Sequence, residues 1–560
     1  MLIRLVALNA RFVHSSPALF YLRNLLAENL PDGELELCQF TINDPYYDTL
    51  LRLAQGSPAA IFFSVYVWNA AYVRRLILDL AQIRPDLALV AGGPQAAHLE
   101  LPAPVKLTVA QGPAEGLGPD FYGDLVQGRL GSLYRAAAAA PFVMPYRPED
   151  CRGELRHRHI YYESSRGCPF ACSYCLSATR RGVAYRDLAA VLAELELLLS
   201  CRPPVIRFVD RTFNAPPERA LAIWRFLARR GGDTRFHFEI APDLFDEAGL
   251  AFLATVPPGL FQFEIGLQSF NPASLAAVNR NPDLAKARSN IRRLAAAGNI
   301  HLHLDLILGL PFETAASYRH SLNEILALRP HHLQLGLLKV LPDTPLAQRR
   351  EEFALRCCQE PPYPVLATRW LAQPDLAELY LLGELIEAYY NPRYFLATLA
   401  YIMDRETDPA AFFTALAATA GEHGFAGRAR TQELLSTILA HHWRRRPDGE
   451  LGLELLRFDW LACGHRRLPD HLVPAGVGDE LKTAQDRLWR ALPDHYPPLF
   501  SPQSRSSFFK RSVFAPFSAA ALNQLGMGPG DQPGIVAFLA ESTGGLKPRQ
   551  ATVFFPSPDR

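Results

Sequence analysis

The first 140 residues of the chain alternate short apolar runs with longer amphipathic stretches. The apolar runs predict five strands, at 2–8, 34–40, 59–64, 87–91 and 105–110. Helices are predicted at 69–83 and at 17–30, where Ser16 is placed as the cap and Pro17 as the first residue. Strands that alternate with helices indicate a doubly wound, Rossmann-like parallel sheet, which binds ligands at the carboxyl ends of its strands.

The same alternation returns after residue 157. Six strands are predicted, at 159–165, 205–209, 235–240, 260–266, 301–308 and 333–340, with helices such as 188–199, 217–229, 283–297 and 315–328 between them. Six such units indicate a partial TIM-like barrel, a (β/α)6 arrangement whose active site lies at the carboxyl ends of the strands. Beyond residue 350 the pattern is mainly helical, at 376–388, 394–404, 409–418 and 430–444. The α/β chain therefore divides into 1–135, a linker at 136–157, a core at 158–350 and a C-terminal domain at 351–560.

Composition and charge narrow the class of protein. With 560 residues, 49% hydrophobic and 20% charged, the chain is globular and too long for one ordinary core. A formal net charge of +1 gives no electrostatic basis for a nucleic acid or an anionic membrane as partner. The N-terminus lacks the features of a signal peptide, and no apolar run reaches ~18 residues. We therefore expect a cytoplasmic protein without a membrane or nucleic-acid partner.

Three of the nine cysteines lie together, as Cys168, Cys172 and Cys175, and the remainder are irregularly spaced, which predicts no disulfide framework. Three thiolates in one loop can hold three irons of a [4Fe–4S] cube and leave the fourth iron open for chemistry. The alternatives are three buried apolar cysteines or half of a zinc site. A zinc site needs a fourth ligand, usually from a second paired motif, and the chain has no second Cys-x-x-Cys.

The C-x3-C-x2-C spacing, with Tyr174 just before the last cysteine, resembles the signature of the radical S-adenosylmethionine (SAM) enzymes. In that family the open iron binds the amino and carboxylate groups of SAM, and an electron from the cluster yields a 5′-deoxyadenosyl radical. The resemblance covers roughly residues 158–346, with its motifs in the expected order. It implies a [4Fe–4S] cluster held by the three cysteines, SAM as the second cofactor, and a reductant such as flavodoxin or ferredoxin.

Polar residues follow or interrupt the predicted core strands, where apolar packing does not require them. Glu264 interrupts an apolar strand, and a buried carboxylate without a partner costs several kcal/mol, so it must meet a cation, a hydroxyl or a ligand. A structural hydrogen bond inside the barrel is the simpler reading. By resemblance, Glu264, Gln268 and Ser269 belong to a fourth-strand motif for the ribose and methionyl parts of SAM. Ile307 and Gly309 belong to a fifth-strand motif against adenine. Asp210 stands where the family has a Gly-Gly-Glu stretch, but the glycines are missing, so its contact with the amino group is uncertain.

The first domain also resembles a known module. A five-stranded α/β domain directly before the cysteine loop resembles the cobalamin-binding domain of many radical SAM proteins, in which Gly-Gly-Pro follows the fourth strand. Here that sequence is Gly92-Gly93-Pro94, and taken alone it is a tight turn. The resemblance places Ser64, at the end of the third strand, with these residues in the cobalamin site. The cobalt-ligating D-x-H-x-x-G pattern is absent, and His14 is the only candidate ligand, although a loop histidine is more often a local hydrogen-bonding residue.

Together these features predict a cobalamin-dependent radical SAM enzyme that methylates an unactivated carbon of an unknown small molecule. By resemblance, the radical removes a hydrogen, cobalamin supplies the methyl group, and a second SAM re-methylates the cobalamin. Two readings remain open: a radical rearrangement or cyclisation without methyl transfer, and a non-catalytic cobalamin or electron carrier. Methylthio transfer is weaker, because those relatives carry three more N-terminal cysteines and only Cys38 lies there. No catalytic side chain is predicted, and the C-terminal domain resembles an uncharacterised domain of one bacterial subfamily.

Overall fold

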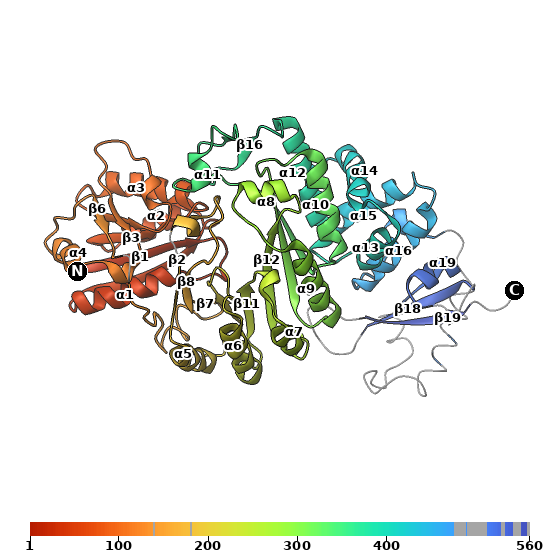
Figure 1. Cartoon of the computed structure of the whole chain (residues 1–560), viewed down its shortest axis with the longest axis horizontal. Coiled ribbons are helices and arrows are strands. Elements are labelled where there is room, and N and C mark those ends of the chain that lie inside the picture. The colour runs from red at the N-terminus through yellow and green to blue at the C-terminus, as the bar shows by residue number, and fades with distance from the viewer. Residues whose placement is uncertain are drawn as a thin grey trace. The chain divides into compact units, whose positions relative to one another are not determined.

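A computed structural model of the chain describes residues 1–137, 140–179, 182–474, 486, 489, 512–527, 532–540 and 550–556 (Figure 1). The chain folds into two compact units, each described by itself below. The first comprises Met1–Tyr318 and Gly336–Leu376, and the second comprises Arg319–Leu335 and Ala377–Arg560. In the described part of the chain, no helix is both long enough and apolar enough to cross a membrane.

The N-terminal sheet is parallel and has the strand order β2-β1-β3-β4-β5-β6. Its strands are β1 (Leu2–Asn9), β2 (Glu34–Thr41), β3 (Ala60–Ser64), β4 (Ala88–Gly92), β5 (Thr108–Gln111) and β6 (Leu133–Arg135). The Rossmann-like prediction is confirmed. The five predicted strands are present, and the sixth, β6, was missed because three residues carry no detectable period. The strand order reverses at β1, so the loops after β1 and β3 border the crevice where such sheets bind ligands.

Helices cover both faces of this sheet, and they include two that the sequence pattern did not predict. They are α1 (Pro17–Asn29), α2 (Tyr46–Ala54), α3 (Ala70–Ile83) and α4 (Pro119–Val126), of which α2 and α4 were missed. Two apolar clusters, one on each face, contain alternate residues of β1 such as Leu5 and Val6. Ser16 occupies the predicted cap position of α1, but its side chain makes no capping hydrogen bond. The Ser16 hydroxyl instead lies 3.5 Å from that of Ser64.

The central sheet has the order β14-β13-β12-β11-β10-β7, as the predicted partial barrel requires. Its strands are β7 (Ile160–Tyr162), β10 (Val205–Phe208), β11 (Arg235–Glu239), β12 (Phe261–Gln268), β13 (His301–Leu308) and β14 (His332–Leu337), and the registers from β7 to β13 are parallel. The helices include α5 (Leu188–Ser200), α6 (Pro217–Arg230), α7 (Glu247–Leu253), α8 (Pro272–Ala277), α9 (Leu284–Ala297) and α10 (Ala315–Ala327). Burial alternates along β12, so its phenylalanines pack against helices while Glu264 lies on the more open face.

The first strand of the core is shorter than the sequence predicted. It ends at Tyr162, and residues Ser165–Gly167 form a separate strand, β8, that pairs antiparallel with β9 (Val183–Tyr185). At Gly167 φ is +97°, and a Cβ atom there would lie 2.2 Å from the carbonyl oxygen of Gly182. Only glycine tolerates this approach, so the chain turns out of the sheet just before the first cluster cysteine.

The second unit is largely helical, as predicted, and ends in a small sheet. Its helices include α12 (Gln373–Tyr390), α13 (Leu396–Arg405), α14 (Pro409–Glu422), α15 (Gln432–Trp443) and α16 (Gly449–Ala462), of which α16 was missed. The strands β17 (Val513–Phe517), β18 (Gly534–Ala540) and β19 (Gln550–Pro556) form an antiparallel sheet.

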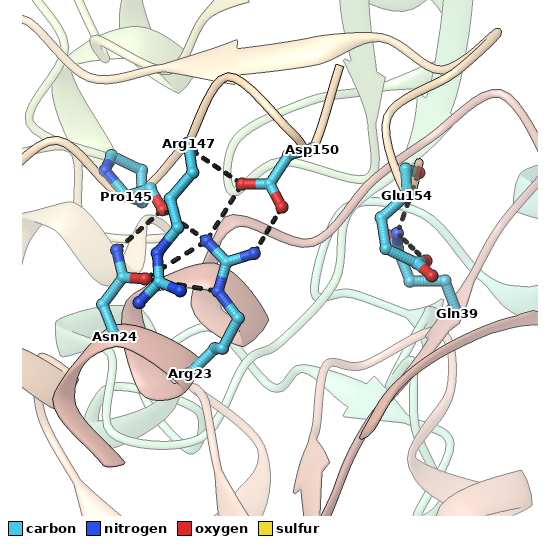
Figure 2. Close-up of polar contacts among 7 residues, drawn as sticks. All are labelled: Arg23, Asn24, Gln39, Pro145, Arg147, Asp150 and Glu154. Carbon is cyan, nitrogen blue, oxygen red and sulfur yellow. Dashed lines mark hydrogen bonds and ion pairs between the residues drawn. The ribbon is translucent and has the colours of Figure 1, made fainter. Parts of the chain in front are cut away.

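The irregular cysteine spacing predicted no disulfide framework, and the structure contains one isolated bridge among the described residues, between Cys151 of the linker and Cys201 at the end of α5. The linker also contacts helix α1 (Figure 2), where Arg23 forms an ion pair with Asp150 and Asn24 donates to the Pro145 carbonyl over 2.9 Å. The sequence pattern carried no sign of these contacts because the linker has no regular secondary structure.

Candidate active site

The three predicted cluster cysteines lie in the loop between β8 and β9. Cys172 is buried, Cys168 and Cys175 are partly exposed, and all three are free thiols. The backbone N–H of Cys175 donates to the Cys172 carbonyl over 3.0 Å, and the Cys168 sulfur lies 3.4 Å from the Thr212 hydroxyl. The loop thus folds back on itself with its sulfur atoms at the carboxyl end of the core strands, as predicted from their position after the first strand.

Asp210 fastens the chain that leads into this loop. Its carboxylate is buried and accepts hydrogen bonds from the Ser164 N–H at 3.0 Å and from the Ser164 and Ser165 hydroxyls, each at 2.6 Å. Burial raises the pKa of Asp210, and the serine hydrogen bonds oppose that rise. Both carboxylate oxygens are therefore occupied by the start of the loop. The contact of Asp210 with SAM stays a prediction.

We expect Asp210→Ala to lower the free energy of unfolding by about 2–3 kcal/mol, because the Ser164 N–H and two hydroxyls lose their acceptor in a buried site. Chemical unfolding of the variant beside Asp233→Ala, which removes an exposed carboxylate, measures the difference. The variant should also bind less iron on reconstitution than the control does. Equal stability and equal iron content in both variants would contradict this role.

A second set of contacts holds the loop from the side of β12. The guanidinium of Arg280 lies 3.6 Å from the Cys172 sulfur and also donates to the Gly266 carbonyl. Asn279 donates to the Ala171 carbonyl over 2.9 Å, and the Ser173 N–H donates to the Val278 carbonyl over 2.9 Å. Sequence reasoning missed this segment, although Asn279 and Arg280 directly follow α8. Arg280 thus places a positive charge beside the Cys172 sulfur.

The donor set fits an iron–sulfur cube. Among the residues that the structure describes, no three His, Cys, Asp or Glu side chains converge on a position for one metal ion. A cube bonds each thiolate to a different iron, so its cysteines need not converge on one point. Three free thiols on one short loop, one of them beside a buried arginine, match that requirement.

Two of the predicted SAM residues meet at one buried carboxylate. Glu313 accepts from the Gly309 N–H over 2.8 Å and from the Ser269 hydroxyl over 3.4 Å, and all of its side chain is buried. Burial raises the pKa of Glu313 to about 8. Gly309 has φ +92°, and a Cβ atom there would lie 2.7 Å from the Val365 side chain. Glu313 thereby joins the ends of β12 and β13, where the resemblance places SAM.

Glu313 gives the protein a specific pH dependence. Its pKa in the folded protein lies above the ordinary value of about 4.3, so its contribution to stability is complete below that value and is lost as pH rises through about 8. Between pH 5 and 9, we expect the free energy of unfolding to fall less steeply in Glu313→Gln than in wild type. The two slopes should differ by up to about 1.4 kcal/mol per pH unit. Chemical unfolding at five pH values tests this, with Glu218→Gln on an exposed helix position as control. Parallel curves for wild type and Glu313→Gln would refute it.

Glu264 is paired, as its place in an apolar strand requires. One carboxylate oxygen lies 3.1 Å from His237 Nε2 and 3.7 Å from Arg207 Nη2. Burial opposes ionisation, but the contact with His237 and the nearby positive charge lower the pKa of Glu264. The structural hydrogen bond weighed from the sequence is therefore present. Glu264 remains 27% exposed, so a ligand can still reach it.

The remaining predicted SAM residues are placed as follows. Gln268 ends β12 with φ +72°, a strained value for a residue other than glycine, next to a register shift between Gly266 and Gln268. Ile307 lies one residue before the end of β13 and is partly buried. Tyr174 lies between Cys172 and Cys175, and burial raises the pKa of its phenol. Strain beside a barrel mouth is typical of functional sites.

The predicted cobalamin residues lie at the carboxyl edge of the N-terminal sheet. Gly93 and Pro94 are exposed, and Ser64 is buried. At Gly93 φ is +102°, and a Cβ atom would lie 2.5 Å from the Val65 carbonyl oxygen, so the turn requires glycine. His14 Nδ1 lies 2.5 Å from the Tyr161 hydroxyl, so Nε2 is the ring nitrogen that remains for another ligand.

This edge fits a large cofactor that has both an apolar ring face and polar side groups. Phe12, Val13 and Trp68 keep 57%, 37% and 50% of their surface exposed in the loops after β1 and β3. The Asn9 Nδ2 donor at the end of β1 is buried and has no partner. Exposed apolar side chains beside an unsatisfied donor are typical of a ligand site. The structure therefore offers both an apolar platform and a polar contact for cobalamin.

Comparison with known families decides the class of the core. Residues 162–325 match the radical SAM superfamily. The chain is a radical SAM protein. This family implies a [4Fe–4S] cluster and SAM, in agreement with the expectation from the cysteine motif. Residues 351–520 match a second family, described as a protein of unknown function (DUF4080).

Several relatives of this radical SAM protein are methyltransferases. The cobalamin-dependent radical SAM methyltransferase TokK of Streptomyces tokunonensis is 25% identical over 350 residues, covering 54% of this chain and 51% of TokK. The bacteriochlorophyllide d C-12(1)-methyltransferase of Chlorobaculum tepidum is 24% identical, covering 56% of this chain and 72% of that protein. The chain thus spans about half the length of TokK. The structure of the cobalamin-dependent SAM radical enzyme OxsB shares the fold, with a TM-score of 0.57 and 15% identity over 88% of this chain and 83% of OxsB.

Proposed function

We propose that this radical SAM protein is a cobalamin-dependent methyltransferase that acts on an unactivated carbon of a small molecule. The observation that carries the proposal is the contact between the carboxyl edge of the N-terminal sheet and the mouth of the core. His98, after β4, lies 2.8 Å from Asp343, after β14. Gln95 donates to the Tyr363 hydroxyl in the same region. These contacts support a proposal in which the two candidate cofactor sites face one another within one unit.

Arg166, two residues before the first cluster cysteine, strengthens this link. Its guanidinium contacts Glu115 at 2.5 Å and Glu163 at 2.7 Å, and Glu115 belongs to the turn after β5. The Arg166 and Glu115 side chains are only 16% and 5% exposed. Removing Arg166 would leave the Glu115 carboxylate buried without its partner, which costs about 3–5 kcal/mol. This ion pair fixes the cysteine loop relative to the proposed cobalamin domain.

The cofactors supply the difficult chemistry, namely radical generation from SAM and methyl transfer from cobalamin. The protein's own residues bind and orient them. Cys168, Cys172 and Cys175 would hold the cluster. Glu264, Gln268, Ser269 and the backbone at Ile307 and Gly309 would hold SAM. Exposed apolar side chains and the Asn9 donor at the first sheet would hold cobalamin, and covering them would exclude water from the space between the two sites.

The names of the relatives support methyl transfer. The proposal also includes a reductant, such as flavodoxin or ferredoxin, that donates electrons to the cluster. Anaerobic protein reconstituted with iron and sulfide should absorb visible light as an Fe–S protein and form 5′-deoxyadenosine from SAM and dithionite. Its visible spectrum should change on addition of cobalamin. The absence of both Fe–S absorbance and 5′-deoxyadenosine would reject the proposed enzyme and would favour a non-catalytic carrier.

Methyl transfer needs its own test. Methyl-deuterated SAM should place deuterium in the product of a candidate substrate. Product formation without deuterium would instead support a radical rearrangement or cyclisation, the alternative that keeps the same core chemistry. Cobalamin that leaves the spectrum unchanged would remove the cofactor from the proposal while leaving the radical SAM core intact.

A further inference from the structure

One row of residues, paired in register across the core strands, carries hydrogen-bond donors and no carboxylate. Residues paired in register on parallel strands point to the same face, so a row can be followed from strand to strand. Tyr161 pairs with Arg207, Arg207 with His237, His237 with Gln262, and Gln262 with His301. We call these five residues the donor row. It lies on the face of Glu264, since Gln262 and Glu264 alternate with the buried phenylalanines of β12.

Carboxylates lie in the next row on the same face, two residues closer to the carboxyl ends of the strands. Glu239 pairs with Glu264, and Glu264 pairs with His303. The Glu264 carboxylate lies 3.7 Å from Arg207. A row of neutral donors and one guanidinium beneath a row of acids is a separation of charge that barrel packing does not require.

Arg207 is the centre of the donor row. Its Nη2 lies 2.8 Å from His237 Nε2. The same Nε2 lies 3.1 Å from a Glu264 carboxylate oxygen, so this ring nitrogen stands between the guanidinium and the carboxylate. His237 is 2% exposed, and its Nδ1 has no hydrogen-bond partner. A buried ring nitrogen without a hydrogen-bond partner costs about 1–3 kcal/mol, which a ligand group that pairs with it would recover.

The first loop of the N-terminal domain adds more donors beside Arg207. His14 contacts the Tyr161 hydroxyl, and the His159 ring lies 5.5 Å from that of His14. Burial lowers the pKa of His14, His159 and His237, and the charge of Arg207 lowers all three further. The surroundings of Arg207 thus disfavour additional positive charge. Arg207 itself keeps 25% of its side chain exposed, so a ligand can reach its other N–H groups.

We propose that Arg207, with Tyr161, His14 and His237, binds an anionic group of the substrate, either a carboxylate or a phosphate. This inference rests on the proposed function, because it assigns a chemical class to the substrate of that site. Planar guanidinium groups bind both anions through paired N–H donors, and the hydrogen-bonded pair of His14 and Tyr161 keeps one further donor. A substrate held there lies inside the core, beneath the row that carries Glu239 and Glu264.

Calorimetric titration of the full-length, anaerobically reconstituted protein with inorganic phosphate and with succinate tests this site. Wild type should bind at least one of them, and Arg207→Gln should weaken that binding by about tenfold or more, since a charged hydrogen-bonding partner is lost. The matched control is Arg229→Gln, which removes an exposed arginine of α6 and should change the affinity less than about twofold. Equal affinity in wild type and Arg207→Gln would overturn the proposal.

Two further arms keep the test decisive. If Arg207→Gln does not fold, His14→Gln in the loop after β1 should weaken binding severalfold, and unchanged affinity in that variant would overturn the site. If saturating cobalamin abolishes phosphate binding, the anion belongs to the cofactor and the assignment to substrate fails. 5′-Deoxyadenosine formation in the same wild-type sample tests the proposed function separately, because it does not depend on the anion.

Discussion

Cys172→Ala is expected to abolish radical formation. Removing one of three thiolates leaves an iron of the cube without its protein ligand, so the variant should lose visible Fe–S absorbance and lower 5′-deoxyadenosine formation by about hundredfold or more. Cys172 is also the most buried of the three and lies beside Arg280, so water cannot readily replace its sulfur. Iron content, the visible spectrum and 5′-deoxyadenosine from SAM and dithionite measure the effect.

The matched control is Cys463→Ala, which removes an exposed thiol that follows α16 and donates to the Tyr394 carbonyl. It should retain cluster and activity, because that sulfur lies outside the cysteine motif. Wild-type amounts of iron and 5′-deoxyadenosine in Cys172→Ala would show that this residue is a buried structural cysteine and not a cluster ligand.

Trp224→Ala should cause the largest loss of stability among single changes in the core. The indole is 1% exposed and packs against aromatic rings, with centroids 5.6 Å from both Phe213 and Phe263. Truncation leaves a cavity in a close-packed cluster, so we expect the free energy of unfolding of the first unit to fall by about 3–5 kcal/mol. Chemical unfolding followed by circular dichroism measures it.

Trp68→Ala is the control for this change, because the same side chain is removed from a position that is 50% exposed. Its cost should stay near or below about 1 kcal/mol. A similar loss in both variants would mean that the size of the residue, rather than its burial among the rings of α6, β11 and β12, determines the effect.

Most of the regular structure could be predicted from the sequence because it follows from hydrophobic periodicity. The buried strands β1, β3 and β13 carry long apolar runs, and α6 and α9 carry a helical period with clear ends. Short elements were not predicted. β6 has three residues, and β8 separates from β7 only because of the turn at Gly167 and the contacts of Asp210 with two serines. Local periodicity does not encode such distant partners.

The candidate site was predictable to the extent that a motif names its residues. The three cysteines, Glu264 and Ser269 belong to recognisable patterns, whereas the partners that position them do not. Arg280 reaches Cys172 over 108 residues of sequence, and Arg166 reaches Glu115 over 51. Arg166 stands two residues before the first cluster cysteine, so its charge was a usable signal. The donor row becomes visible only once the register of four strand pairs is known.

The contacts around β7 set a limit on how this protein can be taken apart. The His159 N–H donates to the Val13 carbonyl, Ser15 donates to the His159 carbonyl over 2.7 Å, and Tyr146 of the linker donates to the Tyr161 carbonyl over 2.6 Å. A gene fragment that starts at the first core strand, β7, would therefore encode an edge strand without its bonded neighbours. We expect the N-terminal domain and the core to be expressed, and exchanged between homologues, as one piece, with the cut placed elsewhere along the chain.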